Sequence, residues 1–180
     1  PVAESELHYA DPYQLLVAVI LSAQCTDKRV NMTTPALFEA FPTPYHMARA
    51  TAEEIYPYIR SISYPNNKAR NLAGMARMLC EEFGGEVPSD LEQMQRLPGV
   101  GRKSANLIMG DVFGKPAIVT DTHCIRLTNR IGLVDGIKEP KKVEMALWKI
   151  IPPEEGSDLC HRLVYHGREI CTARTKPYCD

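Results

Sequence analysis

The sequence predicts an all-α fold. In almost every segment, apolar residues recur at the three- and four-residue spacing of one helix face, and no segment alternates apolar and polar residues as a half-buried strand does. The segments between these patterns are rich in proline and glycine, which end helices and form turns. We therefore expect about nine or ten short helices. A chain of 180 residues suffices for one substantial core or for two small lobes.

The first two helices are expected at 13–25 and 27–41. The first is apolar on nearly every side, which is typical of a helix at the centre of a bundle, and residues 22–27 after it are abruptly polar. The second should break near Pro35, because proline lacks the N–H group that a helix interior needs.

The next two helices are expected at 51–59 and 66–83. Thr51 and Glu54 form a capping-box pattern at the start of the first. The second is amphipathic, and the two glycines at 84–85 end it. The remaining helices are expected at 89–97, 103–112, 121–131, 141–151 and 156–170.

The charge is nearly balanced but uneven along the chain. Residues 1–96 carry 8 Lys and Arg against 12 Asp and Glu, a net charge of −4, and residues 97–180 carry 13 against 10, a net charge of +3. A basic surface for nucleic acid would therefore be local and built mainly from the second half; ordinary surface scatter is the alternative. The longest apolar run, residues 15–21, is too short to cross a membrane.

Six cysteines could form three disulfides, but we expect free thiols. Four of them lie within helical apolar patterns, where cysteine behaves as a small buried hydrophobe. No basic leader followed by an apolar stretch points to secretion, so a reduced cytoplasmic protein is the prediction. The six are Cys25, Cys80, Cys124, Cys160, Cys171 and Cys179.

A Pro-Gly-Val-Gly turn at 98–101 separates two of the expected helices. Proline ends the first helix, and the glycines permit backbone angles and close approaches that a Cβ forbids. Such a turn exposes N–H groups beside the start of the second helix, a combination that binds an anion such as a DNA phosphate. Arg102 adds a cation, and Val100 would anchor the turn in the core. A Gly-x-Gly alone is most often only a tight turn.

Two residues near helix starts carry candidate chemistry. Lys103 lies in the first turn of its helix, where the helix dipole repels a cation; with Arg102 and some burial, this would lower its pKa and favour the neutral, nucleophilic amine. Asp121 precedes the next helix, and its simplest role is that of an N-cap.

These residues belong to longer strings that resemble the endonuclease III family of helix-hairpin-helix DNA glycosylases and AP lyases. The resemblance covers nearly the whole chain and keeps the family's order. The strings are LLVAVILSAQCTD (15–27), NNKARNL (66–72), VPSDLEQMQRLPGVGRKSAN (87–106), VTDTHCIRLTNRIGL (119–133) and HGREIC (166–171).

The resemblance implies a two-lobed helical DNA glycosylase fold with the active site between the lobes. Residues 5–115 would form the central helical-barrel lobe, with the helix-hairpin-helix at about 89–112. Residues 1–4 and 116–180 would form the second lobe, which normally carries an iron-sulfur cluster, and we expect it to be truncated at both ends.

The resemblance also implies base excision repair by a bifunctional DNA glycosylase and AP lyase. Lys103 would attack the deoxyribose C1′ of a damaged nucleotide, an oxidised pyrimidine above all, form an imine and nick the strand by β-elimination. Asp121 would activate that attack and stabilise positive charge on the sugar. The partner would be double-stranded DNA with a damaged base or an abasic site. The protein would act as a monomer, without a membrane, in a bacterial-type cytoplasm near the nucleoid.

Extruding a nucleotide leaves a gap in the duplex. Gln24 aligns with the family's intercalating wedge, although a helix-end cap is its simpler role. Asp27 and His123 align with pocket residues. The other expected DNA-binding residues are Leu97, Gly99, Val100, Gly101, Arg102 and Ser104.

Two features depart from the family pattern. The family's [4Fe-4S] cluster uses the spacing C-x6-C-x2-C-x5-C. Here only Cys171 and Cys179 are present, with seven residues between them, and the last two ligands are absent from this chain. The family more often has glycine and an aromatic residue where this chain has Ser61 to Pro65, so base preference could differ.

Two alternatives remain at this point. A monofunctional mismatch glycosylase, such as the adenine-mismatch branch, lacks the nucleophilic lysine, so Lys103 counts against it. A non-catalytic helix-hairpin-helix module that only binds DNA would not need Lys103 and Asp121 together.

Overall fold

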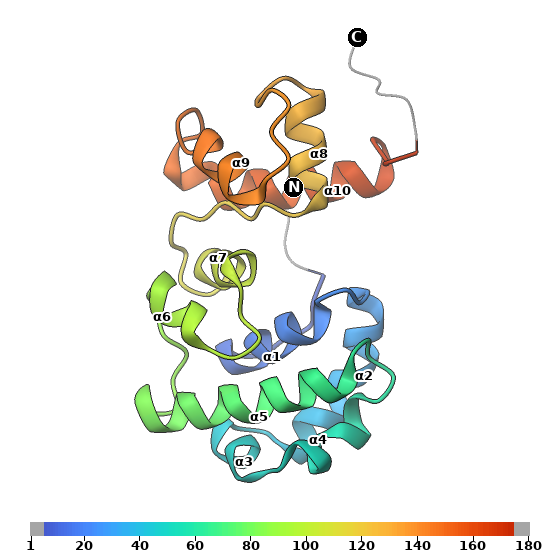
Figure 1. The fold of residues 1–180 in the computed structure, drawn as a ribbon, viewed down its shortest axis with the longest axis vertical. Coiled ribbons are helices and arrows are strands. Elements are labelled where there is room, and N and C mark those ends of the chain that lie inside the picture. Colours follow the sequence, from blue (N-terminus) through green and yellow to red (C-terminus); the bar gives the residue numbers. More distant parts are fainter. Residues whose placement is uncertain (1–5, 175–180) are drawn as a thin grey trace. The chain divides into compact units, whose positions relative to one another are not determined.

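A computed structural model describes residues 6–174 of the chain, and this part is helical, without β-strands. The described residues divide into two compact units, 6–108 and 109–174. We call them the N-terminal unit and the C-terminal unit and describe each by itself (Figure 1). The boundary expected from the sequence lies later, at 115–116, whereas the division falls within helix α7.

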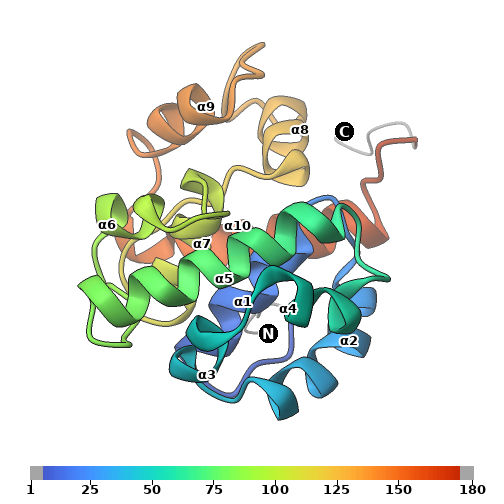
Figure 2. The same ribbon diagram turned by 60° about the horizontal axis from the view of Figure 1, so that its bottom comes forward.

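The N-terminal unit is built around α1 (Pro12–Ser22). Residues 15–21 of this helix are all buried, as its uniformly apolar sequence predicts. Helices α1 and α2 pack together, and α5 runs along α3 and α4, which Figure 2 shows from a second side. The other helices are α2 (Asp27–Ala40), α3 (Pro44–Arg49), α4 (Ala52–Ile59), α5 (Pro65–Glu82), α6 (Leu91–Arg96) and α7 (Arg102–Asp111).

Local signals locate several helix ends correctly. The capping box of α4 is present: the Thr51 side chain accepts from the Glu54 N–H, and the Glu54 carboxylate accepts from the Thr51 N–H. The end of α5 is followed by Gly84 and Gly85, both with positive φ.

The helices of this unit differ from the expectation in three respects. Helix α1 ends at Ser22, earlier than expected, because Gln24 adopts a left-handed conformation (φ 52°). Helix α2 runs through Pro35 without a break; Pro35 lies on the exposed side, where water can replace the missing donor. Helix α3 was not expected, since six residues are too few to show a helical period.

The C-terminal unit is smaller and contains α8 (Thr122–Arg130), α9 (Pro140–Leu147), a 3₁₀ turn (Pro153–Glu155) and α10 (Gly156–Glu169). Helix α10 packs against α8. A Cβ on Gly167 would meet the His123 ring nitrogen at 2.5 Å, so only glycine permits this approach. The buried core is formed by Ile118, Cys124, Leu127, Val134, Val143, Leu147, Cys160, Leu163 and Cys171.

No helix in residues 6–174 is both long and apolar enough to span a membrane. The cysteines of this part of the chain, Cys25, Cys80, Cys124, Cys160 and Cys171, are free thiols. Cys124 and Cys160 are fully packed in the core of the C-terminal unit, as expected, whereas Cys25 and Cys80 are only half-buried.

Candidate DNA-binding and active site

The turn between α6 and α7 packs tightly against the N-terminal unit. Gly99 has φ +83°, and a Cβ there would lie 3.1 Å from atoms of both Ile20 and Asn71. Leu97 and Val100 are buried on either side of it, so the turn is anchored as predicted. Only Gly99 requires glycine for its conformation; Gly101 has no positive φ and faces open space.

The exposed side of this turn leads directly into α7. Gly101 is exposed, and its carbonyl accepts from the Ala105 N–H at 2.9 Å, which places it at the start of the helix. Arg102 and Ser104 are half-buried in the first turn. A helix N-terminus carries a partial positive charge, so the open space around Gly101 suits the approach of an anion.

Lys103 is the second residue of α7 and is exposed. The partial burial that we expected for it is therefore wrong. Lys103 lies beside the turn, so a DNA strand whose phosphate is bound at Gly101 would have a deoxyribose near the amine. The exposure of the amine suits a nucleophile, which must be accessible to its substrate.

Asp121 is the N-cap of α8. Its Oδ1 accepts from the Cys124 N–H at 2.7 Å, so the structural role expected from the sequence is confirmed. The cap fixes the side chain in one orientation. A carboxylate oriented in this way can still interact with a cation through its other oxygen.

His123 is held inside the C-terminal unit. Its Nδ1 lies 3.2 Å from Arg126 Nη2, and its ring contacts Gly167. Burial lowers the pKa of His123, Asp121 opposes this, and the nearby cations Arg126 and Arg168 lower it further. The ring is therefore held mainly neutral.

Gln24 and Asp27 both lie near the start of α2. Gln24 is exposed in the turn after α1, and its carbonyl accepts from Ser63 Oγ at 2.8 Å. Asp27 is the first residue of α2 and is half-buried, behind the N-cap Thr26.

The predicted site residues thus fall into two groups. Gln24, Asp27, Lys103 and the turn belong to the N-terminal unit, and Asp121 and His123 belong to the C-terminal unit.

Sequence reasoning missed Lys68. It is only 5% exposed, and its ammonium donates to the carbonyls of Leu21 (2.8 Å) and Ala23 (2.6 Å). The signal was present: Lys68 precedes Leu72 by four residues on the apolar face of α5, where a solvated lysine does not belong.

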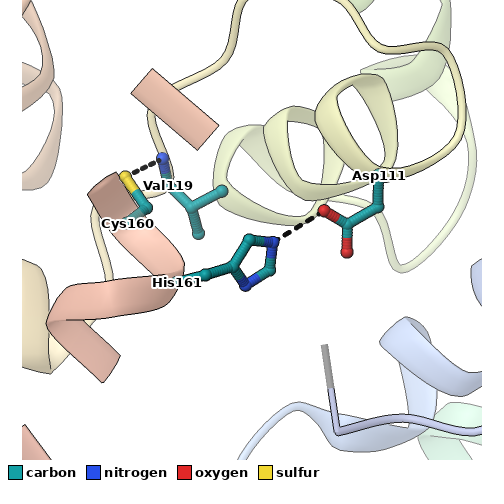
Figure 3. A network of polar contacts seen from close by, with 4 residues as sticks. All are labelled: Asp111, Val119, Cys160 and His161. Carbon is teal, nitrogen blue, oxygen red and sulfur yellow. Dashed lines mark hydrogen bonds and ion pairs between the residues drawn. The ribbon is translucent and has the colours of Figure 1, made fainter. Parts of the chain in front are cut away.

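The segment that leads to Asp121 is held by a polar network in the C-terminal unit, shown in Figure 3. The Val119 N–H donates to Cys160 Sγ at 3.2 Å, and on the next residue of α10 His161 Nε2 lies 2.8 Å from Asp111 Oδ1. The bond to Asp111 raises the pKa of His161 against the opposing effect of burial. This network ties the end of α7 and the segment before α8 to α10.

Cys171, the first expected cluster ligand, is buried at the end of α10. Arg130 donates to its Sγ at 3.0 Å and to the Thr172 carbonyl at 2.9 Å, while Arg126 donates to the Cys171 carbonyl at 2.8 Å. These bonds hold the Cys171 side chain and the main chain on both sides of it against α8. Cys179 lies outside the described residues.

The cluster itself does not follow from the structure. Within residues 6–174, no group of three or more His, Cys, Asp or Glu side chains could hold a metal. One thiol does not make a four-thiolate site, so the described residues do not by themselves fit a cluster.

Known proteins are similar to this chain in both sequence and fold. The HhH-GPD superfamily base excision DNA repair protein family matches residues 17–153. Endonuclease III of Synechocystis sp. is 46% identical over 180 residues, covering 99% of this chain and 81% of the relative. Endonuclease III of Escherichia coli is 42% identical over 179 residues, covering 99% and 84%.

Solved structures agree. A trapped covalent intermediate of endonuclease III with DNA matches with a TM-score of 0.92 at 45% identity, covering 98% of this chain and 83% of that one. A thermostable thymine-DNA glycosylase matches with a TM-score of 0.83 at 26% identity, covering 93% and 79%. The all-α helix-hairpin-helix fold expected from the sequence is thereby confirmed. The chain belongs to the HhH-GPD superfamily of base excision DNA repair proteins and, within it, to the endonuclease III family.

Proposed function

We propose that this base excision repair DNA glycosylase and AP lyase uses Lys103 as its nucleophile and acts, as a monomer, on oxidised pyrimidines and abasic sites in double-stranded DNA. The observation that carries the proposal is the position of Lys103, exposed in the first turn of α7 directly after the Gly99 turn. The relative trapped as a covalent complex with DNA supports a covalent step in the family.

The lysine accounts for both activities. Its neutral amine attacks C1′ of the deoxyribose, the bond from C1′ to the base breaks, and the base leaves with a proton. The amine nitrogen is now joined to C1′ in the closed sugar ring, so the C1′–O4′ bond breaks next, O4′ takes up a proton, and the nitrogen shares its electron pair with C1′ to form a protonated imine. This imine loses a proton from C2′, and the C3′–O bond breaks with departure of the 3′ phosphate. The imine is finally hydrolysed by water, which returns the free amine.

Asp121 serves the same step from the C-terminal unit. Its carboxylate accepts the proton that the amine loses on attack, and it stabilises positive charge on the sugar as the base departs. The cap to Cys124 orients this side chain without consuming its charge.

The remaining residues hold the DNA. The N–H groups around Gly99 and Gly101, with the start of α7, bind a phosphate, and Arg102 adds a charge. Gln24 enters the gap that the extruded nucleotide leaves, and its amide bonds to the orphaned base. Asp27 and His123 line the pocket. From the family alone, we also propose that Cys171 and Cys179 would hold part of a [4Fe-4S] cluster.

The test is trapping with borohydride on a duplex that carries an abasic site or an oxidised pyrimidine. Reduction of the imine leaves a stable covalent adduct, which Lys103→Gln should abolish. Lys141→Gln is the matched control, because Lys141 is also exposed and is also the second residue of its helix, α9. An adduct that persists in Lys103→Gln would contradict the assignment. Base release without any adduct would indicate a mismatch-type glycosylase, and binding alone a DNA-binding module.

A further inference from the structure

We propose that Lys68 is a positioning residue for Gln24, whose ammonium group holds the turn after α1 in the conformation from which Gln24 projects. The inference rests on the proposed function, in which Gln24 fills the gap in the duplex. It assigns to a buried residue of α5 a role in recognising the lesion.

The ammonium group of Lys68 is fully used. It donates to Leu21 O at 2.8 Å, to Ala23 O at 2.6 Å and to Ser63 Oγ at 3.3 Å. These three acceptors match the three N–H bonds of a protonated lysine, whereas a neutral amine has only two. Because its donors are engaged and the residue is 5% exposed, Lys68 is not a second nucleophile.

The end of α1 compensates the buried charge. The last turn of α1 contains no basic residue of its own, and its carbonyls carry the partial negative charge of a helix C-terminus. Lys68 supplies the missing cation from α5. Burial lowers the pKa of Lys68, and the nearby Cys25 opposes this effect.

The contacts converge on a strained turn. Gln24 (φ 52°) and Tyr64 (φ 55°) are the two non-glycine residues with positive φ in the described part of the chain. Such conformations persist only where the surroundings enforce them.

Ser63 joins the two turns. Its hydroxyl accepts from Lys68 and donates to the Gln24 carbonyl at 2.8 Å, so the chain of bonds runs from Lys68 through Ser63 to Gln24. Arg29 supports the same loop by donating to the Ser61 carbonyl at 3.3 Å. Without the ammonium group, Gln24 would relax toward a common backbone conformation and its side chain would point elsewhere.

The test compares binding to two duplexes that differ only in a tetrahydrofuran abasic-site analogue. Lesion recognition is measured as a ratio: the dissociation constant for the intact duplex divided by that for the duplex with the analogue. Lys68→Met keeps the length of the side chain and removes the charge. We expect it to reduce the ratio about tenfold, the order that a hydrogen bond to a charged group contributes. Gln24→Ala should reduce the ratio similarly, and the double variant should show no further loss.

Arg77→Met is the matched control. Arg77 also belongs to α5 and also donates to two backbone carbonyls, those of Ala48 (3.3 Å) and Ala50 (3.1 Å), but these lie at the end of α3 rather than of α1. Its loss should change the melting temperature without changing the lesion ratio. If Lys68→Met does not fold, Ser63→Ala, which removes the bond to Gln24, takes its place.

The outcomes separate the two proposals. If Gln24→Ala lowers the ratio and Lys68→Met only lowers the melting temperature, the positioning role is overturned and the wedge assignment stands. If neither variant changes the ratio, both are overturned. Hydrogen exchange gives a second readout: the amides of residues 23–25 should exchange faster in Lys68→Met and not in Arg77→Met, and unchanged exchange would overturn the inference.

Discussion

Replacing Asp111 with asparagine should lower the free energy of unfolding of the C-terminal unit at low pH and change it little at high pH. Asparagine keeps the shape and still offers an oxygen to His161, so the variant removes only the charge. In the wild type, Asp111 raises the pKa of His161 most strongly, through their hydrogen bond, and Cys160 and Asp158 act in the same direction.

The sign follows from the direction of that shift. A histidine whose pKa is raised on folding contributes stability below its unfolded pKa and loses it as the pH rises through the folded value. The side chains of His161 and Asp111 are only 14% and 9% exposed, so solvent screens the pair little. Asp111 Oδ2 is buried without a partner among the described residues, which leaves His161 to offset the charge.

A hydrogen bond to a charged group contributes about 1.5–3 kcal/mol. Asp111→Asn should therefore lower the free energy of unfolding by this amount near about pH 5.5, below the unfolded pKa of histidine. The loss should be less than about 1 kcal/mol at a pH above the folded pKa of His161, where the imidazole is neutral and donates equally well to an amide oxygen.

Urea unfolding followed by tryptophan fluorescence measures this difference. Trp148 is the single tryptophan, and it packs against the core of the C-terminal unit, so its signal reports that unit. Glu139→Gln is the control, because the pair between Lys142 and Glu139 is exposed and contributes little. A difference that is equal at both pH values, or larger at the higher one, would refute the reasoning.

Two further substitutions test the turn and the carboxylate. Gly99→Ala should lower the free energy of unfolding by about 1–3 kcal/mol, because alanine is strained at φ +83° and its Cβ would lie 3.1 Å from Ile20. Gly101→Ala should leave the free energy of unfolding unchanged, because a Cβ there meets no atom within 4 Å. Equal melting temperatures for the two variants would contradict this prediction. Asp121→Asn should keep the melting temperature, since asparagine caps a helix as well as aspartate, yet slow borohydride trapping by at least about a hundredfold. Unchanged trapping kinetics would remove Asp121 from the chemistry.

Short-range sequence signals at helix ends predict much of the fold. The capping box at Thr51, the cap at Asp121 and the glycines after α5 each act within a few residues, so their effect is readable from short strings. Pro35 shows the limit of such rules, because whether proline breaks a helix depends on which side faces water.

The supporting residues of the site depend on contacts distant in sequence. Lys68 reaches carbonyls 45 and 47 residues away, and His161 meets Asp111 across 50 residues. No periodicity reports such pairs. The exposure of Lys103 was also missed, because a helical pattern gives the face of a residue but not what covers it.

The hydrogen bonds from Arg126 and Arg130 to the end of α10 determine which positions in this part of the chain tolerate substitution. Arg126 and Arg130 grip mainly main-chain oxygens, those of Gly167, Cys171 and Thr172. Main-chain oxygens are present whatever the side chain, so saturation mutagenesis should find the two arginines intolerant. The one side-chain acceptor among these contacts at the end of α10 is the sulfur of Cys171, to which Arg130 donates. The attachment of the residues that directly follow α10 therefore depends on the two arginines and on Cys171.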